Sequence, residues 1–96
     1  MGQMLAALCR FDLRIPGCTS LKEKRHVLKS LTASLRQKFN VAVAEVEHQD
    51  LWQRARLAVV SVNTDHGHLE STLQAVQGEA FHAREIQVLD SQTEIL

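Results

Sequence analysis

The segment from Met4 to Ile15 alternates between apolar and polar side chains, and this pattern constrains the fold more than any other feature. Its apolar positions, all of one parity, are Leu5, Ala7, Cys9, Phe11, Leu13 and Ile15. Arg10, Asp12 and Arg14 fall between them and share the opposite side. A period of two over this length is typical of a β-strand with one buried face. We therefore expect a half-buried strand, ended by a turn at Pro16-Gly17.

A helix is predicted after this turn. Ser20-Leu21-Lys22-Glu23 is a capping-box pattern, in which the Ser20 hydroxyl accepts the Glu23 amide and the Glu23 carboxylate bonds the Ser20 amide. The helix is expected to run to about Phe39 and to stop at Asn40. Apolar residues at helical spacing predict its buried stripe, which is Leu21, Leu28, Leu31, Leu35 and Phe39.

Four further elements follow from the same kind of pattern. Val41 to His48 and Arg56 to Asn63 are predicted strands, joined by a polar connection that contains Leu51 and Trp52. Thr64-Asp65 opens a second helix, with either residue as its N-cap. The predicted buried face of this helix is Leu69, Leu73, Val76 and Ala80. A last strand is expected from Arg84 to about Asp90, with Ile86 and Val88 inward and the tail to Leu96 as a candidate extension.

The order of elements is therefore β-α-β-β-α-β. With right-handed crossovers, this order predicts a ferredoxin-like α/β sandwich: a four-stranded antiparallel sheet, with its first and third strands central and two helices on one face. Residues 1–96 are expected to form one such domain. The other face of the sheet is left open.

The small size of the chain favours self-association. A domain of 96 residues buries only about 60–65% of the surface that its unfolded chain exposes. A second copy that covers the open sheet face would add burial, so a homodimer is expected. No segment is apolar enough to predict a membrane span or a secretory signal, and two cysteines form no disulfide framework. We therefore expect a cytoplasmic protein with no membrane partner.

The zero net charge hides an asymmetry between the two parts of the chain. Residues 1–40 contain eight Lys and Arg against two acids, or +6, whereas residues 41–96 contain three Arg against nine acids, or −6. This division is compatible with a polyanion partner, with self-association by charge, or with internal compensation.

The basic residues concentrate on the first predicted helix. Lys22, Arg25, Lys29 and Arg36 fall within about 60° on a helical wheel at about 100° per residue. Such a row could neutralise several phosphates of a nucleic acid. The alternative is an ordinary solvated helix face. The candidate polyanion-binding residues are Lys22, Lys24, Arg25, Lys29 and Arg36.

Trp52 is the single tryptophan, and it lies in the connection between two predicted strands. A tryptophan in such a place either packs locally or anchors a partner. The candidate interface residues are Trp52, Leu51 and Arg54.

Catalytic, metal and cofactor sites are not indicated. No Ser, Cys or Lys has a base at motif spacing, and His66 and His68 would point apart on a helix. Glu45 and Glu47 are two residues apart on a predicted strand, about 7 Å along one face, which would suit acid and base roles. A small enzyme on an anionic substrate is thus a third alternative. Its residues would be Glu45, Glu47, His48 and Asp50, near Arg10 and Arg14.

Several segments resemble the YlxP-like family of small bacterial proteins of unknown function. They are Arg14 to Arg25, Phe39 to Val46, Gln49 to Ala55, and Leu57 to Val62 with Asp65 and His68. The resemblance implies a ferredoxin-like fold and, because the family's genes often lie among translation genes, a link to RNA or ribosomes. It implies no activity, cofactor or catalytic residue.

The leading hypothesis is a non-enzymatic module that contacts RNA or a ribonucleoprotein through its basic first helix. The alternative is a homodimeric or protein-partner module that uses the open sheet face together with Trp52.

Overall fold

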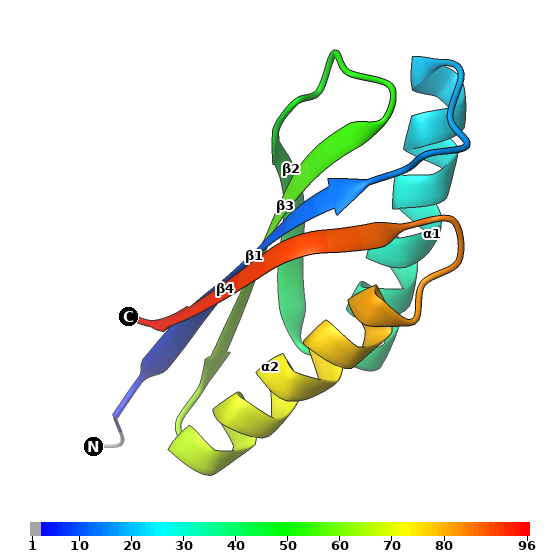
Figure 1. Ribbon diagram of the computed structural model, residues 1–96. Coiled ribbons are helices and arrows are strands. Elements are labelled where there is room, and N and C mark those ends of the chain that lie inside the picture. The colour runs from blue at the N-terminus through cyan, green and yellow to red at the C-terminus, as the bar shows by residue number, and fades with distance from the viewer. Residues whose placement is uncertain (1–2) are drawn as a thin grey trace.

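The computed structural model describes residues 3–96 and contains the expected elements in the expected order. They are β1 (Leu5–Arg14), α1 (Leu21–Lys38), β2 (Val41–Glu47), β3 (Arg54–Asn63), α2 (His66–Phe81) and β4 (Gln87–Ile95). The strands form one antiparallel sheet in the order β2-β3-β1-β4, and both helices lie on the same side of it (Figure 1). The ferredoxin-like α/β prediction is therefore confirmed. Residues 1–2 of the predicted domain lie outside the described residues.

The core lies between the sheet and the two helices. Phe11 and Leu13 of β1 and Leu57 and Val59 of β3 are almost fully buried, as their parity predicts. The helices add Leu28, Leu31, Leu35, Leu69, Leu73, Val76 and Ala80. Alternate residues of the same strands point to the open side of the sheet, where no element of the described chain covers them.

Helix α1 begins with a modified version of the predicted capping box. The Glu23 amide donates to the Ser20 hydroxyl at 3.1 Å, as expected. The Glu23 carboxylate, however, accepts from the Thr19 amide and the Thr19 hydroxyl, at 3.1 and 2.9 Å, and not from the Ser20 amide. The C-cap is Phe39, whose amide donates to Leu35, so the helix ends one residue before the predicted stop at Asn40.

The last strand is shifted relative to its prediction. β4 spans Gln87–Ile95 and not Arg84 to Asp90, because Glu85 has a left-handed φ of 66° that interrupts extended backbone. The strand extends further because residues up to Ile95 pair with β1. Ile86 is buried as predicted but precedes the strand.

Candidate functional site

The candidate site lies on α1, where four basic side chains follow one side of the helix. Lys22, Arg25, Lys29 and Arg36 are separated by three, four and seven residues, which places them close to one another around the helix axis. We call these four residues the cationic rim. All except Lys22 line the groove beside β2, and all four are at least partly exposed. Within residues 3–96, no carboxylate lies within 4.0 Å of their charged nitrogens.

Lys24, the fifth predicted polyanion-binding residue, does not belong to this surface. Its side chain is only 1% exposed, and its Nζ lies 2.7 Å from Oε2 of Glu45. It also donates to the carbonyl of His48. The prediction of a phosphate contact at Lys24 is therefore wrong. Lys24 precedes Leu28 by the same four residues that separate Leu31 from Leu35, so its helical spacing placed it on the buried stripe.

A groove runs between α1 and β2, beside the cationic rim. Its volume is about 410 Å³. Apolar side chains form its floor, and these are Leu28, Val43 and Leu57. The small side chains of Thr32 and Ala33 also line it, between Lys29 and Arg36. The sequence analysis did not predict this groove, because a groove depends on how the side chains of α1 pack against β2. The residue pattern of either element alone does not reveal that packing.

The free edge of β2 is partly occupied by side chains. The guanidinium of Arg36 donates to the carbonyl of Val43 at 2.8 Å. The side-chain amide of Gln49 donates from Nε2 to the carbonyl of Glu45 at 3.4 Å. Both carbonyls accept from side chains and belong to residues of the same parity, so they are the groups that a strand added at the free edge would need. Arg36 and Gln49 therefore protect the edge against strand pairing.

Glu45 and Glu47 do not form the pair predicted for acid and base chemistry. The register shifts between them, where β2 pairs with β3 irregularly. Glu45 keeps the parity of Val43 and faces Lys24 on the helix side, whereas the irregularity turns Glu47 to the open side, where it pairs with Arg56 at 3.0 Å. The prediction of one shared strand face is wrong because a β-bulge breaks the period of two.

The loop between β2 and β3 holds the predicted interface residues. Trp52 and Leu51 are 53% and 44% exposed. Gln53 fixes the loop to the β1–α1 turn, because its side chain donates to the carbonyl of Cys18 and its own carbonyl accepts the amide of Ile15. Arg54 lies on the sheet and donates hydrogen bonds to the carboxylate of Asp12. Of the three candidate interface residues, Trp52 and Leu51 are therefore the ones that the loop exposes as apolar side chains.

The open sheet face has an apolar part and a charged part. Its apolar residues are joined by the strand registers, and we call them the apolar patch: Leu8, Ala42, Ala44, Ala58, Val60 and Val62. The charged part follows toward the other end of β1 and β3. It contains Arg10, Arg14, Arg54 and Arg56 with Asp12, Glu47, Asp90 and Glu94. Trp52 adjoins the charged part, because it lies in the loop just before Arg54, which is about 20 Å along β3 from Val60 at about 3.3 Å per residue.

Asp12 is at the centre of the charged part. Both of its carboxylate oxygens accept from Arg54, at 2.9 and 3.0 Å, and Arg56 lies 3.8 Å away. These hydrogen bonds lower the pKa of Asp12 below its usual value, although burial opposes them, and the charges of Arg54 and Arg56 add to the effect. Asp12 therefore stays ionised and keeps its arginines neutralised.

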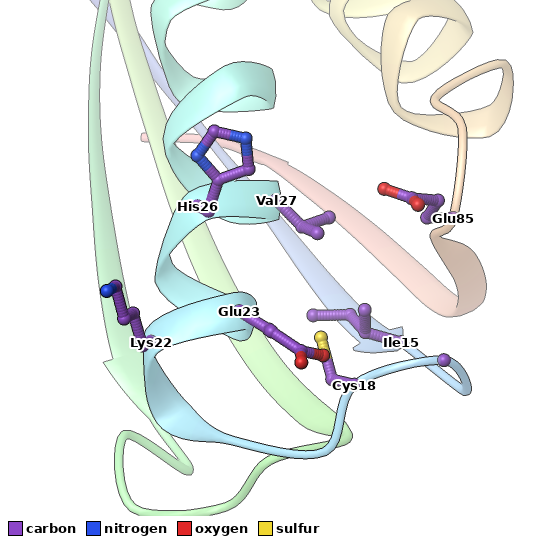
Figure 2. Close-up of a pocket in the computed structure, with 8 residues that line it drawn as sticks. Ile15, Cys18, Lys22, Glu23, His26, Val27 and Glu85 are labelled. Atoms are coloured by element: carbon purple, nitrogen blue, oxygen red, sulfur yellow. The ribbon is translucent and has the colours of Figure 1, made fainter.

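A second cavity, of about 430 Å³, lies between the start of α1, the β1–α1 turn and the loop before β4 (Figure 2). Ile15, Cys18 and Val27 point into it, and the carboxylates of Glu23 and Glu85 flank it, whereas Lys22 points away. Burial raises the pKa of the Cys18 thiol, and the two carboxylates raise it further. The thiol therefore stays protonated and is a poor nucleophile. This cavity does not suit an anionic ligand.

The described residues also bear on metal binding and on membrane insertion. The described part of the chain holds no group of three or more His, Cys, Asp or Glu side chains placed to bind a metal ion. No helix between residues 3 and 96 is both long and apolar enough to cross a membrane.

Comparison with known proteins places the sequence and the fold in context. A family model described as "Protein of unknown function (DUF503)" matches residues 6–93. "Uncharacterized protein YlxP" of Bacillus subtilis (strain 168) is 42% identical over 57 residues, or 59% of this chain. The match covers 62% of that relative, so the chain spans less than two thirds of its length.

Solved structures resemble the fold at low sequence identity. Protein SO0527 from Shewanella oneidensis has a TM-score of 0.59 and 17% identity, over 100% of this chain and 91% of that one. The de novo designed protein Foldit4 has a TM-score of 0.56 and 12% identity, over 98% and 94%. At such identities the likeness concerns the fold alone, and a fold does not determine a function.

Proposed function

The chain belongs to the DUF503 family, and for this member we propose a non-enzymatic function: it binds RNA or a ribonucleoprotein through the cationic rim of α1. One observation carries the proposal. Lys22, Arg25, Lys29 and Arg36 stand on one side of a single helix with no carboxylate of residues 3–96 paired to them. The acids of the later part of the chain neutralise other cations, including Arg10, Lys24 and Lys38.

The electrostatics of such a rim suit a polyanion. Each phosphate that a lysine or arginine neutralises releases a counterion, so affinity falls steeply with salt. A zero net charge does not oppose this, because at an ionic strength near 0.1 M charges are screened beyond about 10 Å and the local charge decides. From Lys22 to Arg36 the helix rises by about 21 Å, at about 1.5 Å for each of fourteen steps, which is long enough for several phosphates.

Charge reversal of the rim tests the proposal. Substituting Lys22→Glu, Arg25→Glu and Lys29→Glu together is expected to weaken binding to a mixed RNA pool on the order of 100-fold at low salt. We expect the slope of log affinity against log salt to fall by about 2, since each contact with single-stranded nucleic acid contributes about 0.7. Fluorescence anisotropy of the labelled pool at several salt concentrations measures both quantities.

The matched control reverses the same amount of charge elsewhere. A variant with Arg14→Glu, Lys38→Glu and Arg84→Glu has the same net charge but an intact rim. It is expected to bind RNA within a few-fold of the parent protein. Equal losses in the two variants would show that only net charge matters, and a parent protein that binds no RNA at low salt would exclude the function.

The open sheet face favours a second candidate function, assembly with a second copy of the chain. Its charged part contains four arginines and four carboxylates, so its net charge is zero and two copies of this face would not repel each other. A two-fold axis parallel to the strands, between β1 and β3, would place Leu8 of each copy over Val60 of the other and Asp12 over Arg56. Four strands of this length cover roughly 600 Å², close to the roughly 800 Å² that each partner buries in a standard interface.

A charge placed in the apolar patch tests this assembly. Val62 is 49% exposed in the single chain, so Val62→Lys is expected to fold normally and to leave a monomer. The control is Phe81→Lys, at a residue of α2 that is 58% exposed on the helix side of the sheet. Sedimentation equilibrium up to about 200 μM should then give dimers for the parent and the control. A monomeric parent at that concentration would rule the dimer out.

A further inference from the structure

The groove between α1 and β2 indicates which form of RNA the cationic rim would select. An exposed cationic helix alone would serve any polyanion, whether paired or unpaired. Here Arg25, Lys29 and Arg36 border a groove with an apolar floor of Leu28, Val43 and Leu57. The acidic residue that also lines this groove, Glu45, is paired with Lys24. Its volume of about 410 Å³ lies in the range of about 300–1,000 Å³ that is usual for small-ligand sites.

An apolar floor distinguishes a free base from a paired one. In a duplex, the faces of the bases are stacked on one another, and a protein meets mainly phosphates, sugars and groove edges. The floor would gain no contact from such a ligand. An unpaired nucleotide can turn its base toward apolar side chains or a guanidinium plane while its phosphate faces a cation.

The small residues of the groove leave room for this contact. Thr32 and Ala33 line the groove between Lys29 and Arg36, so no long side chain covers the floor there. The guanidinium of Arg36 is held at the groove by its hydrogen bond to the carbonyl of Val43, so it is placed there before any ligand arrives. A planar arginine of this kind stacks readily on a base.

An extended peptide is a poorer occupant of the same groove. A peptide would bind here by adding a strand to the edge of β2, which requires free carbonyl groups along that edge. The carbonyls of Val43 and Glu45 already accept from Arg36 and Gln49. Strand addition would have to break these bonds, whereas a base that rests on the groove floor leaves them intact.

We infer that the α1–β2 groove takes an unpaired nucleotide, so that the ligand of the cationic rim is single-stranded RNA; this inference rests on the proposed function. Lys29 and Arg25 contact the phosphates on the outer side of the groove. The base of one nucleotide lies beside Ala33, against the apolar floor and next to the guanidinium of Arg36.

The test compares one RNA sequence in two forms. A labelled mixed-sequence 12-nucleotide RNA is titrated at low salt, first single-stranded and then annealed to its complement. The parent protein is expected to prefer the single strand on the order of 10-fold, which is typical of the contact of one base. Ala33→Leu fills the groove without a change of charge and with only a small change of helix propensity. It is expected to remove this preference and to leave duplex binding unchanged.

The matched control is Gln37→Leu, an apolar substitution one turn along α1 at an exposed residue that does not line the groove. It is expected to change neither affinity. If the parent binds both forms equally, or if Ala33→Leu weakens both forms equally, the groove inference is wrong while the proposed RNA surface stands. If the parent binds neither form, the proposed function itself fails.

Discussion

Replacing Lys24 by alanine is expected to lower the free energy of unfolding by about 3 kcal/mol, because the change leaves a partly buried carboxylate without its cation. The Nζ of Lys24 is 2.7 Å from Glu45, in a contact that is an ion pair more than a directed hydrogen bond. The aliphatic stem of Lys24 is buried as well, so packing is lost together with charge. Urea titration followed by far-ultraviolet circular dichroism measures the difference.

Lys22→Ala is the matched control for Lys24→Ala. Lys22 is an exposed residue of the same helical turn, and its loss is expected to change stability by less than about 0.5 kcal/mol. The double variant Lys24→Met with Glu45→Leu should recover much of the loss, since apolar residues often replace a buried ion pair without cost. Equal small effects of the two alanine substitutions would contradict the buried role of Lys24.

Replacing Phe11 by alanine is expected to destabilise the domain by about 4 kcal/mol, which is the usual cost of removing a large aromatic side chain from a core. Phe11 is fully buried on the central strand β1, against Leu57 on its neighbour. Small domains are stable by only about 5–15 kcal/mol. The melting temperature should therefore fall by about 20 °C, at about 4–8 °C per kcal/mol.

Leu89→Ala serves as the comparison for Phe11→Ala. Leu89 is a large apolar residue of the same sheet, but it is 49% exposed on β4. Its replacement is expected to cost less than about 1 kcal/mol, because most of its surface is not removed from water on folding. Thermal unfolding of both variants by circular dichroism gives the comparison. A larger loss for Leu89 than for Phe11 would contradict the position of the core.

The two lysines of one helical turn show how much of the candidate site a sequence can predict. Lys22 and Lys24 are both basic residues on a predicted helix, and both were predicted to contact phosphate. Spacing alone separates them, since Lys24 continues the series of Leu28, Leu31 and Leu35. Arg25, Lys29 and Arg36 are exposed, as their positions on the helical wheel indicate, because helical periodicity depends only on near neighbours, whereas their contact with phosphate stays a prediction.

Local patterns along the chain were enough to predict the six elements, their buried faces and the topology of the sheet. These follow from period two, from period 3.6 and from caps such as Ser20 and Asp65, which are local properties of a chain. Three features could not be predicted in this way: the contact of Lys24 with Glu45, the bulge between Glu45 and Glu47, and the groove between α1 and β2. These features depend on how α1 packs against β2 and on how β2 pairs with β3. The local pattern of one element does not reveal which side chains another element brings to it.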